Sequence, residues 1–177
     1  MVATTAAAAQ RRETRMGLTA KNPFEEAEEL KGEESQPGAP GASVDVIGLD
    51  HIAVAVADLG GALEQYRTVF GLTVETREVV ADEGVEVAVL RLGDVALHLV
   101  SPVDDDADLA AFLEEWGPGL HHLGLRVADA SDAVAVMERE GYDVVDQVTH
   151  PGVAGTRVAY VNPHDIDGTI IQVVEGT

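Results

Sequence analysis

The chain has 177 residues, enough for one domain with a hydrophobic core, and a formal net charge of −21 from 32 acidic and 11 basic residues. Such an acidic surface disfavours nucleic acids and anionic membranes as partners. The sequence contains no cysteine, which excludes disulfides, thiolate metal ligands and cysteine nucleophiles. No apolar run approaches the roughly 18 residues of a membrane span, so we expect a cytoplasmic protein without a membrane partner.

Residues 1–45 are predicted to form a disordered or partly helical acidic tail and linker. They are rich in Ala, Glu, Gly and Pro and contain few large apolar side chains. Within them, "NPFEEAEEL" places a candidate N-cap, Asn22, before a proline and several acids, which favours a short helix. The folded domain is expected to cover residues 46–177, where Val, Ile, Leu and Ala become frequent.

This domain consists of two similar halves, at about 46–102 and 118–175. The stretch "LDHIAVAVAD" of the first half returns as "LHHLGLRVAD" in the second, with an offset of 71 residues that aligns His51 with His122. In chain order, each half begins with a strand that carries its histidine and continues with a helix whose expected N-cap is Asp58 or Asp129. Three strand segments follow in each half.

The expected strands are residues 72–80, 85–93 and 95–102 in the first half and 142–150, 156–163 and 168–175 in the second. An acid-headed helix and a Gly-Pro-Gly turn, within residues 104–119, connect the halves. The sequence therefore predicts an α+β fold in which two β-α-β-β-β repeats form a concave mixed sheet.

Four polar side chains are expected to converge on this sheet. Side chains alternate along a strand, so His51 shares a face with Ala53, and His122 shares a face with Gly124 and Arg126. Near the C-terminus the offset becomes 74 residues and aligns His98 with Gln172. If the halves pair about a pseudo-twofold axis, the first and last strands of both bring together one set of side chains: His51, His98, His122 and Gln172.

These three imidazoles and one carboxamide form a neutral ligand set that suits Zn²⁺, Co²⁺, Ni²⁺, Mn²⁺ or Fe²⁺. The alternative is that each histidine is an ordinary hydrogen-bonded core residue. His121 is expected on the opposite strand face from His122, as a supporting or surface residue. His150 and His164 lie in predicted turns, where exposure to solvent is expected.

The segments "DHIAVAV", "GPGLHHLGLRV" and "VNPHDIDGTIIQVV" resemble the vicinal oxygen chelate superfamily, which includes glyoxalases, bleomycin-resistance proteins and dioxygenases. Within it, the chain is most similar to the methylmalonyl-CoA epimerases, from about Val46 to Glu175. The resemblance implies metal ligands from the first, fourth, fifth and eighth strands, which fall on His51, His98, His122 and Gln172. Gln172 stands where the family has glutamate, and His98 where it has glutamine or glutamate.

The resemblance also implies an enzyme that uses a divalent ion to stabilise the enolate formed when a proton leaves the carbon next to a carbonyl. The family's base falls in "VADEGVEV", which makes Asp82 and Glu83 the catalytic candidates. Arg126 is expected to bind a substrate carboxylate. The implied substrate is a small molecule, specifically an acyl-CoA, and the implied assembly is a homodimer.

Because a glutamine side chain does not carry protons near neutral pH, Gln172 leaves other functions open. One is a different lyase or isomerase of the superfamily, of the glyoxalase or biosynthetic type. Another is a protein that sequesters a small molecule without a metal, and a third is an interaction protein that acts through its acidic tail.

Overall fold

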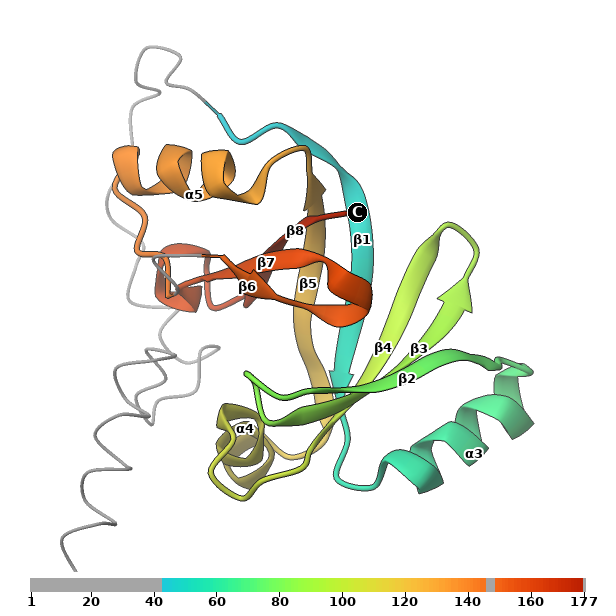
Figure 1. Ribbon diagram of the computed structural model, residues 1–177. Helices are drawn as coiled ribbons and strands as arrows, with labels where there is room; N and C mark the ends of the chain where they lie inside the picture. Colours follow the sequence, from blue (N-terminus) through green and yellow to red (C-terminus); the bar gives the residue numbers. More distant parts are fainter. Residues whose placement is uncertain (1–42, 146–148, 177) are drawn as a thin grey trace, which may run out of the picture.

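The computed structural model describes residues 43–145 and 149–176 and contains one curled eight-stranded sheet in the order β2-β3-β4-β1-β5-β8-β7-β6 (Figure 1). The predicted α+β fold with two β-α-β-β-β repeats is confirmed. The first repeat contains β1 (Val46–Ala55), α3 (Leu59–Phe70), β2 (Val74–Val80), β3 (Val85–Leu92) and β4 (Val95–Pro102). The second repeat, which follows α4 (Asp108–Trp116), contains β5 (Gly119–Val127), α5 (Ala130–Arg139), β6 (His150–Pro151), β7 (Arg157–Val161) and β8 (Ile171–Glu175), with 3₁₀ turns η1 (Val153–Gly155) and η2 (Pro163–Asp165).

The two repeats meet within one chain through the antiparallel pair β1–β5 at the centre of the sheet. Inside each repeat the first strand lies parallel to the last, β1 beside β4 and β5 beside β8. This pairing is the pseudo-twofold arrangement expected from the sequence. It places the four strands that carry the candidate ligands next to one another, in the order β4-β1-β5-β8.

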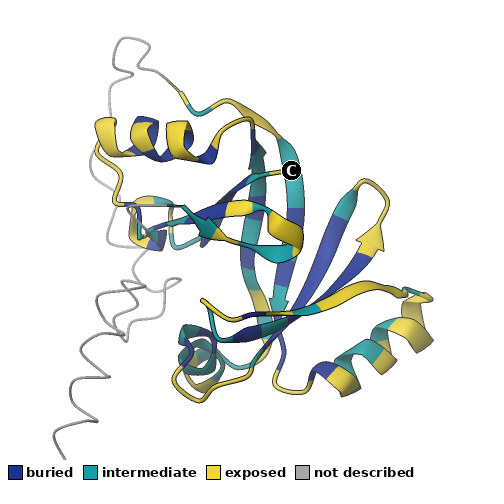
Figure 2. Cartoon of the chain, viewed as in Figure 1, coloured by how far each residue is buried: buried dark blue, intermediate teal, exposed yellow. Residues whose placement is uncertain are grey.

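Helices α3 and α5 begin at the predicted caps. The Asp58 carboxylate accepts a hydrogen bond from the amide of Gly61 at 3.0 Å, and Asp129 accepts one from the amide of Asp132 at 2.9 Å. Helix α3 ends at Gly71, whose φ of 69° lies in the left-handed region that glycine tolerates. Figure 2 shows that β4 is largely buried and that β1 and β5 are buried only in part, whereas each helix turns an exposed side to solvent.

Three hydrophobic clusters hold the sheet and helices together. One joins α3 to β3 and β4 around the buried Leu90 and Leu99, and another joins α5 to β7 and β8 around Val161 and Val173. The third cluster lies between the first repeat and α4, where Leu109 is buried. The strands that carry the candidate ligands are thus backed by packed side chains on their other surface.

The strand predicted for residues 142–150 is different in the structure. Among its described residues, Val144 makes a single bridge to Val161, and β6 begins only at His150. Pro151 cannot donate a backbone hydrogen bond, which limits β6 to a two-residue edge strand. The helix expected at "NPFEEAEEL" lies outside the described residues. No helix in the described part of the chain is long and apolar enough to cross a membrane.

Candidate active site

Two adjacent rows of the sheet bring the four candidate ligands together. In one row, His51 pairs with Gly124, which pairs with Gln172. In the next row, His98 pairs with Ala53, which pairs with His122. Neighbouring strands lie about 4.8 Å apart, so residues one or two strands apart on the same face are within reach of one another. All four side chains are buried, with exposed fractions of 3% for His51, 7% for His98, 5% for His122 and 4% for Gln172.

Small residues leave the space that these side chains occupy. Ala53 separates His98 from His122, and Gly124 separates His51 from Gln172. A Cβ atom on Gly124 would lie 2.4 Å from Cε1 of the His51 ring. The imidazole of His51 therefore occupies the position that a side chain at residue 124 would need. A glycine inside an otherwise apolar strand is the sequence signal for such a close approach.

The three rings are in direct contact. Nε2 of His51 and Nε2 of His122 are 3.0 Å apart, which is hydrogen-bond distance. The rings of His51 and His98 are stacked, with centroids 4.0 Å apart and planes at 12°. On its other side, His51 contacts Oδ1 of Asp50 through Nδ1 at 3.0 Å, and Arg126 donates from Nε to Oδ2 of the same carboxylate at 3.1 Å.

The prediction that His121 lies on the opposite face from His122 is wrong. In the β1–β5 pairing, Ala53 is opposite His122 but Val54 is opposite Leu120, so His121 is the extra residue of a β-bulge. The bulge turns His121 toward the site, where its Nδ1 lies 2.8 Å from Nδ1 of His122. Its Nε2 is buried and has no hydrogen-bond partner among the described residues.

Burial keeps the imidazoles of His98, His121 and His122 neutral. Removal from water lowers the pKa of His98 to about 3 and the pKa of His121 to about 4. Burial, together with the neighbouring histidines, also holds the pKa of His122 well below its usual value. The pKa of the Asp50 carboxyl is lowered, mainly by its hydrogen bond with His51 and further by Arg126. Neutral rings keep lone pairs that a cation can bind.

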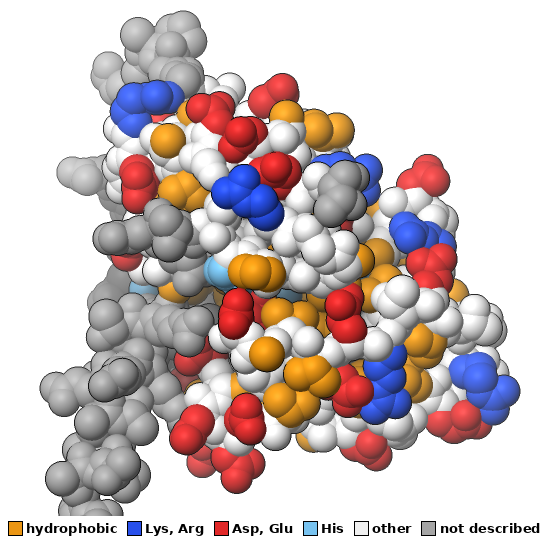
Figure 3. Space-filling model, in the orientation of Figure 1, with side chains coloured by type: hydrophobic (Ala, Val, Ile, Leu, Met, Phe, Trp, Pro, Cys, Tyr) orange, Lys and Arg blue, Asp and Glu red, His pale blue; other side chains and the backbone are white. Residues whose placement is uncertain are grey.

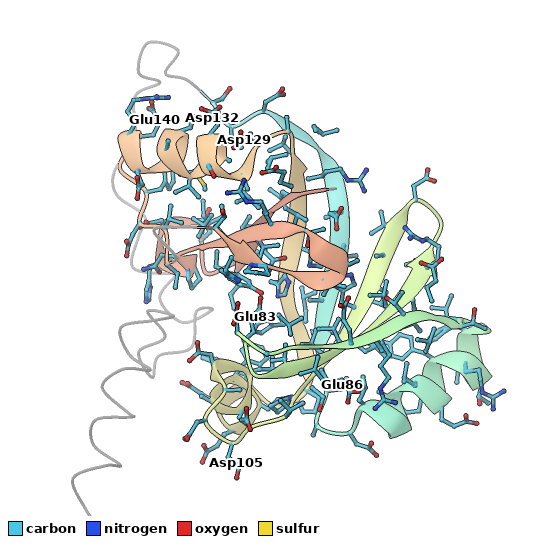
Figure 4. The ribbon with its side chains drawn as sticks, in the orientation of Figure 1. Glu83, Glu86, Asp105, Asp129, Asp132 and Glu140 are labelled. Atoms are coloured by element: carbon cyan, nitrogen blue, oxygen red, sulfur yellow. The ribbon has the colours of Figure 1, made fainter. Side chains whose placement is uncertain are left out.

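His51, His98 and His122, together with Asp50, line a cavity of about 240 Å³ between the first repeat and strands β7 and β8. Glu83, from the turn between β2 and β3, lies on its wall (Figure 4). The Tyr160 hydroxyl donates to Oε2 of Glu83 at 3.3 Å, and Nδ1 of His150 lies 3.8 Å from Oε1. Figure 3 shows a histidine surface in the hollow between the two halves of this face. Asp82 is exposed and is not part of the cavity wall.

Residues 50–160 match the sequence model of the Glyoxalase/Bleomycin resistance protein/Dioxygenase superfamily. The chain belongs to this superfamily. A superfamily relative, the uncharacterized protein YqjC of Bacillus subtilis, is 30% identical over 127 residues, which cover 72% of this chain and 91% of YqjC. The expected resemblance to the vicinal oxygen chelate superfamily and to methylmalonyl-CoA epimerases is confirmed.

Two solved structures of superfamily members support this assignment. Methylmalonyl-CoA epimerase from Mycobacterium tuberculosis is 31% identical with a TM-score of 0.73, and the match covers 78% of this chain and 93% of that one. A methylmalonyl-CoA epimerase in complex with methylmalonyl-CoA and NH₄⁺ is 28% identical with a TM-score of 0.73, over 75% of this chain and 96% of that one. Both matches span nearly the whole epimerase chain, so they concern the complete fold.

The donor set of this superfamily member fits a divalent ion in chemical type and burial. Three imidazoles and a carboxamide line one cavity, and the side chains of His98 and Gln172 form no hydrogen bond with the described residues. In the side-chain conformations of this structure, no group of three His, Asp or Glu residues within the described ranges has the geometry to hold a metal ion. Because the rings of His51 and His98 are parallel, one of them must turn before both lone pairs face a common centre.

The structure places most of the residues predicted from the sequence around one cavity. His51, His98, His122, Gln172 and Glu83 line it, together with Arg126. No role was predicted for Asp50, Gly124 or Tyr160, which contact these residues directly. Two of these residues could have been found from the sequence. Asp50 is adjacent to His51, and Gly124 is expected on the same strand face as His122.

Proposed function

We propose that the protein is a metal-dependent enzyme that removes a proton from the carbon next to a thioester carbonyl, as in a methylmalonyl-CoA epimerase. One observation carries this proposal: four buried nitrogen and oxygen donors and the carboxylate of Glu83 line the same cavity. The similarity to methylmalonyl-CoA epimerases supports an acyl-CoA as the substrate.

In this proposal His51, His98, His122 and Gln172 hold the divalent ion, which is Co²⁺, Zn²⁺, Ni²⁺, Mn²⁺ or Fe²⁺. A bound ion supplies a Lewis acid that stabilises the negative charge that develops on the carbonyl oxygen. None of the four donors carries a charge, so they leave the charge of the cation uncompensated. A substrate with a carboxylate beside the thioester supplies that compensation, which favours a malonyl-type acyl group.

Glu83 is the proposed base. Its side chain is partly buried on the cavity wall, and the hydroxyl of Tyr160 orients the carboxylate by donating to Oε2. Asp82 remains the second candidate because it occupies the corresponding place in the family pattern, although its side chain is exposed. Inversion of the carbon also needs a proton carrier on the other face of the substrate. The Gln172 amide does not carry protons and so does not fill this second role. The residues therefore support exchange of the substrate proton with solvent more directly than they support inversion of the carbon.

Arg126 is the proposed partner of the substrate carboxylate. Its guanidinium lines the cavity and is 43% exposed, while its Nε is engaged by Asp50. The terminal amino groups make no hydrogen bond with the described residues, so a substrate carboxylate can bind them.

Incubation of the protein with methylmalonyl-CoA in D₂O tests the proposal. Protein purified without chelators is expected to contain about one divalent ion per chain by elemental analysis, consistent with one four-donor site. It is expected to incorporate deuterium at the acidic carbon, and chelation should abolish the exchange. A stoichiometric ion with no exchange in any acyl-CoA of the malonyl class would overturn the substrate assignment.

A second candidate function is the sequestration of a small molecule without a metal. It is favoured by the contact between Nε2 of His51 and Nε2 of His122, which can be a complete hydrogen bond between two neutral rings in the absence of an ion. This function predicts protein that folds, contains no stoichiometric ion and binds small molecules equally well in the presence of a chelator.

A further inference from the structure

Two turns of the sheet are equivalent in the repeat but carry different side chains. The offset of 71 residues aligns the sequence "DEG" of the turn between β2 and β3 with "VAG" of η1, and thereby Glu83 with Ala154. The glycines that end these two stretches, Gly84 and Gly155, both have positive φ angles, of 65° and 77°. The backbone feature is therefore kept in both repeats, whereas the two acids of the first turn are replaced by a valine and an alanine in the second.

The two turns lie on opposite sides of the four candidate ligands. The pseudo-twofold axis passes between β1 and β5, which pair with each other, and residues that are equivalent in the repeats lie on opposite sides of it. Each turn also crosses to the other repeat: Glu83 contacts Tyr160 of β7, and the amide of Ala154 donates to Oε1 of Glu78 on β2 at 2.7 Å. Both Glu83 and Ala154 line the cavity of about 240 Å³.

We infer that the protein is a one-base enzyme, in which Glu83 removes the substrate proton and returns it to the same face, while the face beside Ala154 has no group that carries a proton. This inference rests on the proposed function. It predicts that the carbon next to the thioester carbonyl exchanges its proton with retention of configuration, whereas an epimerase inverts that carbon.

Residues of the second repeat hold Glu83 at the cavity. Tyr160 donates to its Oε2 at 3.3 Å, and Nδ1 of His150 lies 3.8 Å from its Oε1. The rings of His150 and Tyr160 are themselves stacked, with centroids 6.0 Å apart. The side chain of Glu83 is 22% exposed, so its carboxyl group can exchange a proton with solvent. In the first repeat the equivalent positions are Val79 and Val89, which offer no hydrogen bond to a carboxylate at residue 154.

The side of the cavity formed by η1 consists of apolar and neutral side chains. Val153 packs against the hydrophobic cluster of the first repeat, and the side chain of Ala154 is a methyl group. The hydroxyl of Thr156 donates to the carbonyl of Val153 at 2.8 Å. None of these three side chains titrates near neutral pH. The carboxylate of Glu78 accepts from the amide of Ala154 and is not part of the cavity wall.

Two further carboxylates among the described residues line the cavity, and both are engaged by neighbouring side chains. Asp50 is bound by His51 at Oδ1 and by Arg126 at Oδ2. Glu75 accepts from Nε of Arg91 at 3.1 Å and from Nη2 of the same guanidinium at 2.9 Å. Hydrogen bonds and nearby positive charge favour the ionised form of a carboxylate and make it a weaker base. Glu83 is therefore the carboxylate of this cavity that is best placed to accept a proton from carbon.

A single carboxyl group is enough for the exchange reaction. The carboxylate of Glu83 accepts the proton from the carbon, and the electron pair of the broken C–H bond passes into the carbonyl group to form an enolate. In D₂O, the protonated Glu83 exchanges its proton for a deuteron. The deuteron then returns to the same face of the carbon, and the electron pair forms the new C–D bond. Inversion would need an acid on the other face.

Incubation of each C2 epimer of methylmalonyl-CoA in D₂O, with full-length protein purified without chelators, tests the inference. ¹H NMR follows loss of the C2 proton, and chromatographic separation of the two diastereomers follows inversion, with a sample without protein as the correction for spontaneous reaction. One epimer is expected to exchange about 10²- to 10⁴-fold faster than it is inverted, which is the contribution of a positioned acid.

Equal rates of exchange and inversion would overturn the inference and leave the proposed function intact. Absence of exchange in both epimers would overturn the proposed function and this inference with it.

Substitution of Ala154 tests the assignment of the second face. Ala154→Glu places a carboxyl group at the repeat equivalent of Glu83 and is expected to raise the ratio of inversion to exchange by about 10-fold, less than for a positioned acid because Val79 and Val89 do not hold it. Ala154→Gln, which has the same shape but carries no proton, is the matched control and should leave this ratio unchanged. An equal change of the ratio in both variants, or a change in neither, would contradict the inference.

Discussion

The imidazole of His51 lies against the backbone of Gly124, its partner on the neighbouring strand, so closely that a Cβ at residue 124 would be 2.4 Å from Cε1. Gly124→Ala is therefore expected to displace the His51 ring and weaken divalent-ion binding by at least about 10-fold, and to destabilise the fold by about 1–3 kcal/mol through overpacking. Co²⁺ titration and urea denaturation measure the two effects. Gly119→Ala is the matched control on the same strand, because a Cβ there meets no atom within 4 Å. Equal Co²⁺ affinity in both variants would contradict the proposed role of His51.

Glu83 and Asp82 are neighbours in the turn after β2, but only Glu83 lines the cavity. Glu83→Gln is expected to lower deuterium exchange into methylmalonyl-CoA by about 10²- to 10⁴-fold without releasing the ion, because it removes the proposed base and preserves its shape. Asp82→Asn should leave exchange within about twofold of the wild type, as an exposed residue away from the substrate would. Loss of exchange in Asp82→Asn alone would transfer the role to Asp82.

The buried imidazoles should make the metal-free protein sensitive to mild acid. The folded protein does not protonate His98 until about pH 3, whereas the unfolded chain protonates it near its ordinary pKa of 6.5. Because the unfolded state then binds more protons, the free energy of unfolding falls as the pH drops from 6.5 toward 3, by at most about 1.4 kcal/mol per pH unit for this ring.

His98→Gln removes this group and should reduce the slope between pH 7 and pH 5, measured by urea denaturation in the presence of a chelator. The exposed His164 provides the control substitution, His164→Gln. Identical slopes for the wild type and His98→Gln would show that His98 is not buried as a neutral ring.

A carboxylate at position 172 should change metal binding and stability in opposite directions. Gln172→Glu places a charge among neutral buried groups, and we expect the metal-free protein to lose about 3–5 kcal/mol of stability. Divalent ions should then bind more tightly and restore more stability than in the wild type, since ligand binding to the folded state stabilises it. Thermal unfolding with and without Zn²⁺ measures both effects. A large gain of epimerase activity in this variant would indicate that the natural substrate of the wild type is a different one.

Much of the site could be predicted because the chain repeats itself. The offset of 71 residues aligned His51 with His122, and the later offset aligned His98 with Gln172. Alternation along strands then placed these residues on one face, and the sheet order β4-β1-β5-β8 agrees with that placement. Equivalent strands of the two repeats pair in equivalent ways. The repeat in the sequence was therefore sufficient to predict that these four residues share one face of the sheet.

The turn after β2 and the start of β5 could not be predicted in the same way. Strand alternation assumes regular pairing, and the extra residue in β5 breaks it, which is why His121 lies beside His122 and not behind the sheet. The choice between Asp82 and Glu83 depended on the backbone path of a turn, for which alternation gives no rule.

The sequence by itself determined the two repeats, the fold class and the four residues that share a face, because these follow from period and residue type. Only the tertiary structure decided the ring contacts, the role of Gly124, and the partners Asp50 and His121. These depend on how closely two strands approach and on a single inserted residue, and both are results of packing across the whole sheet.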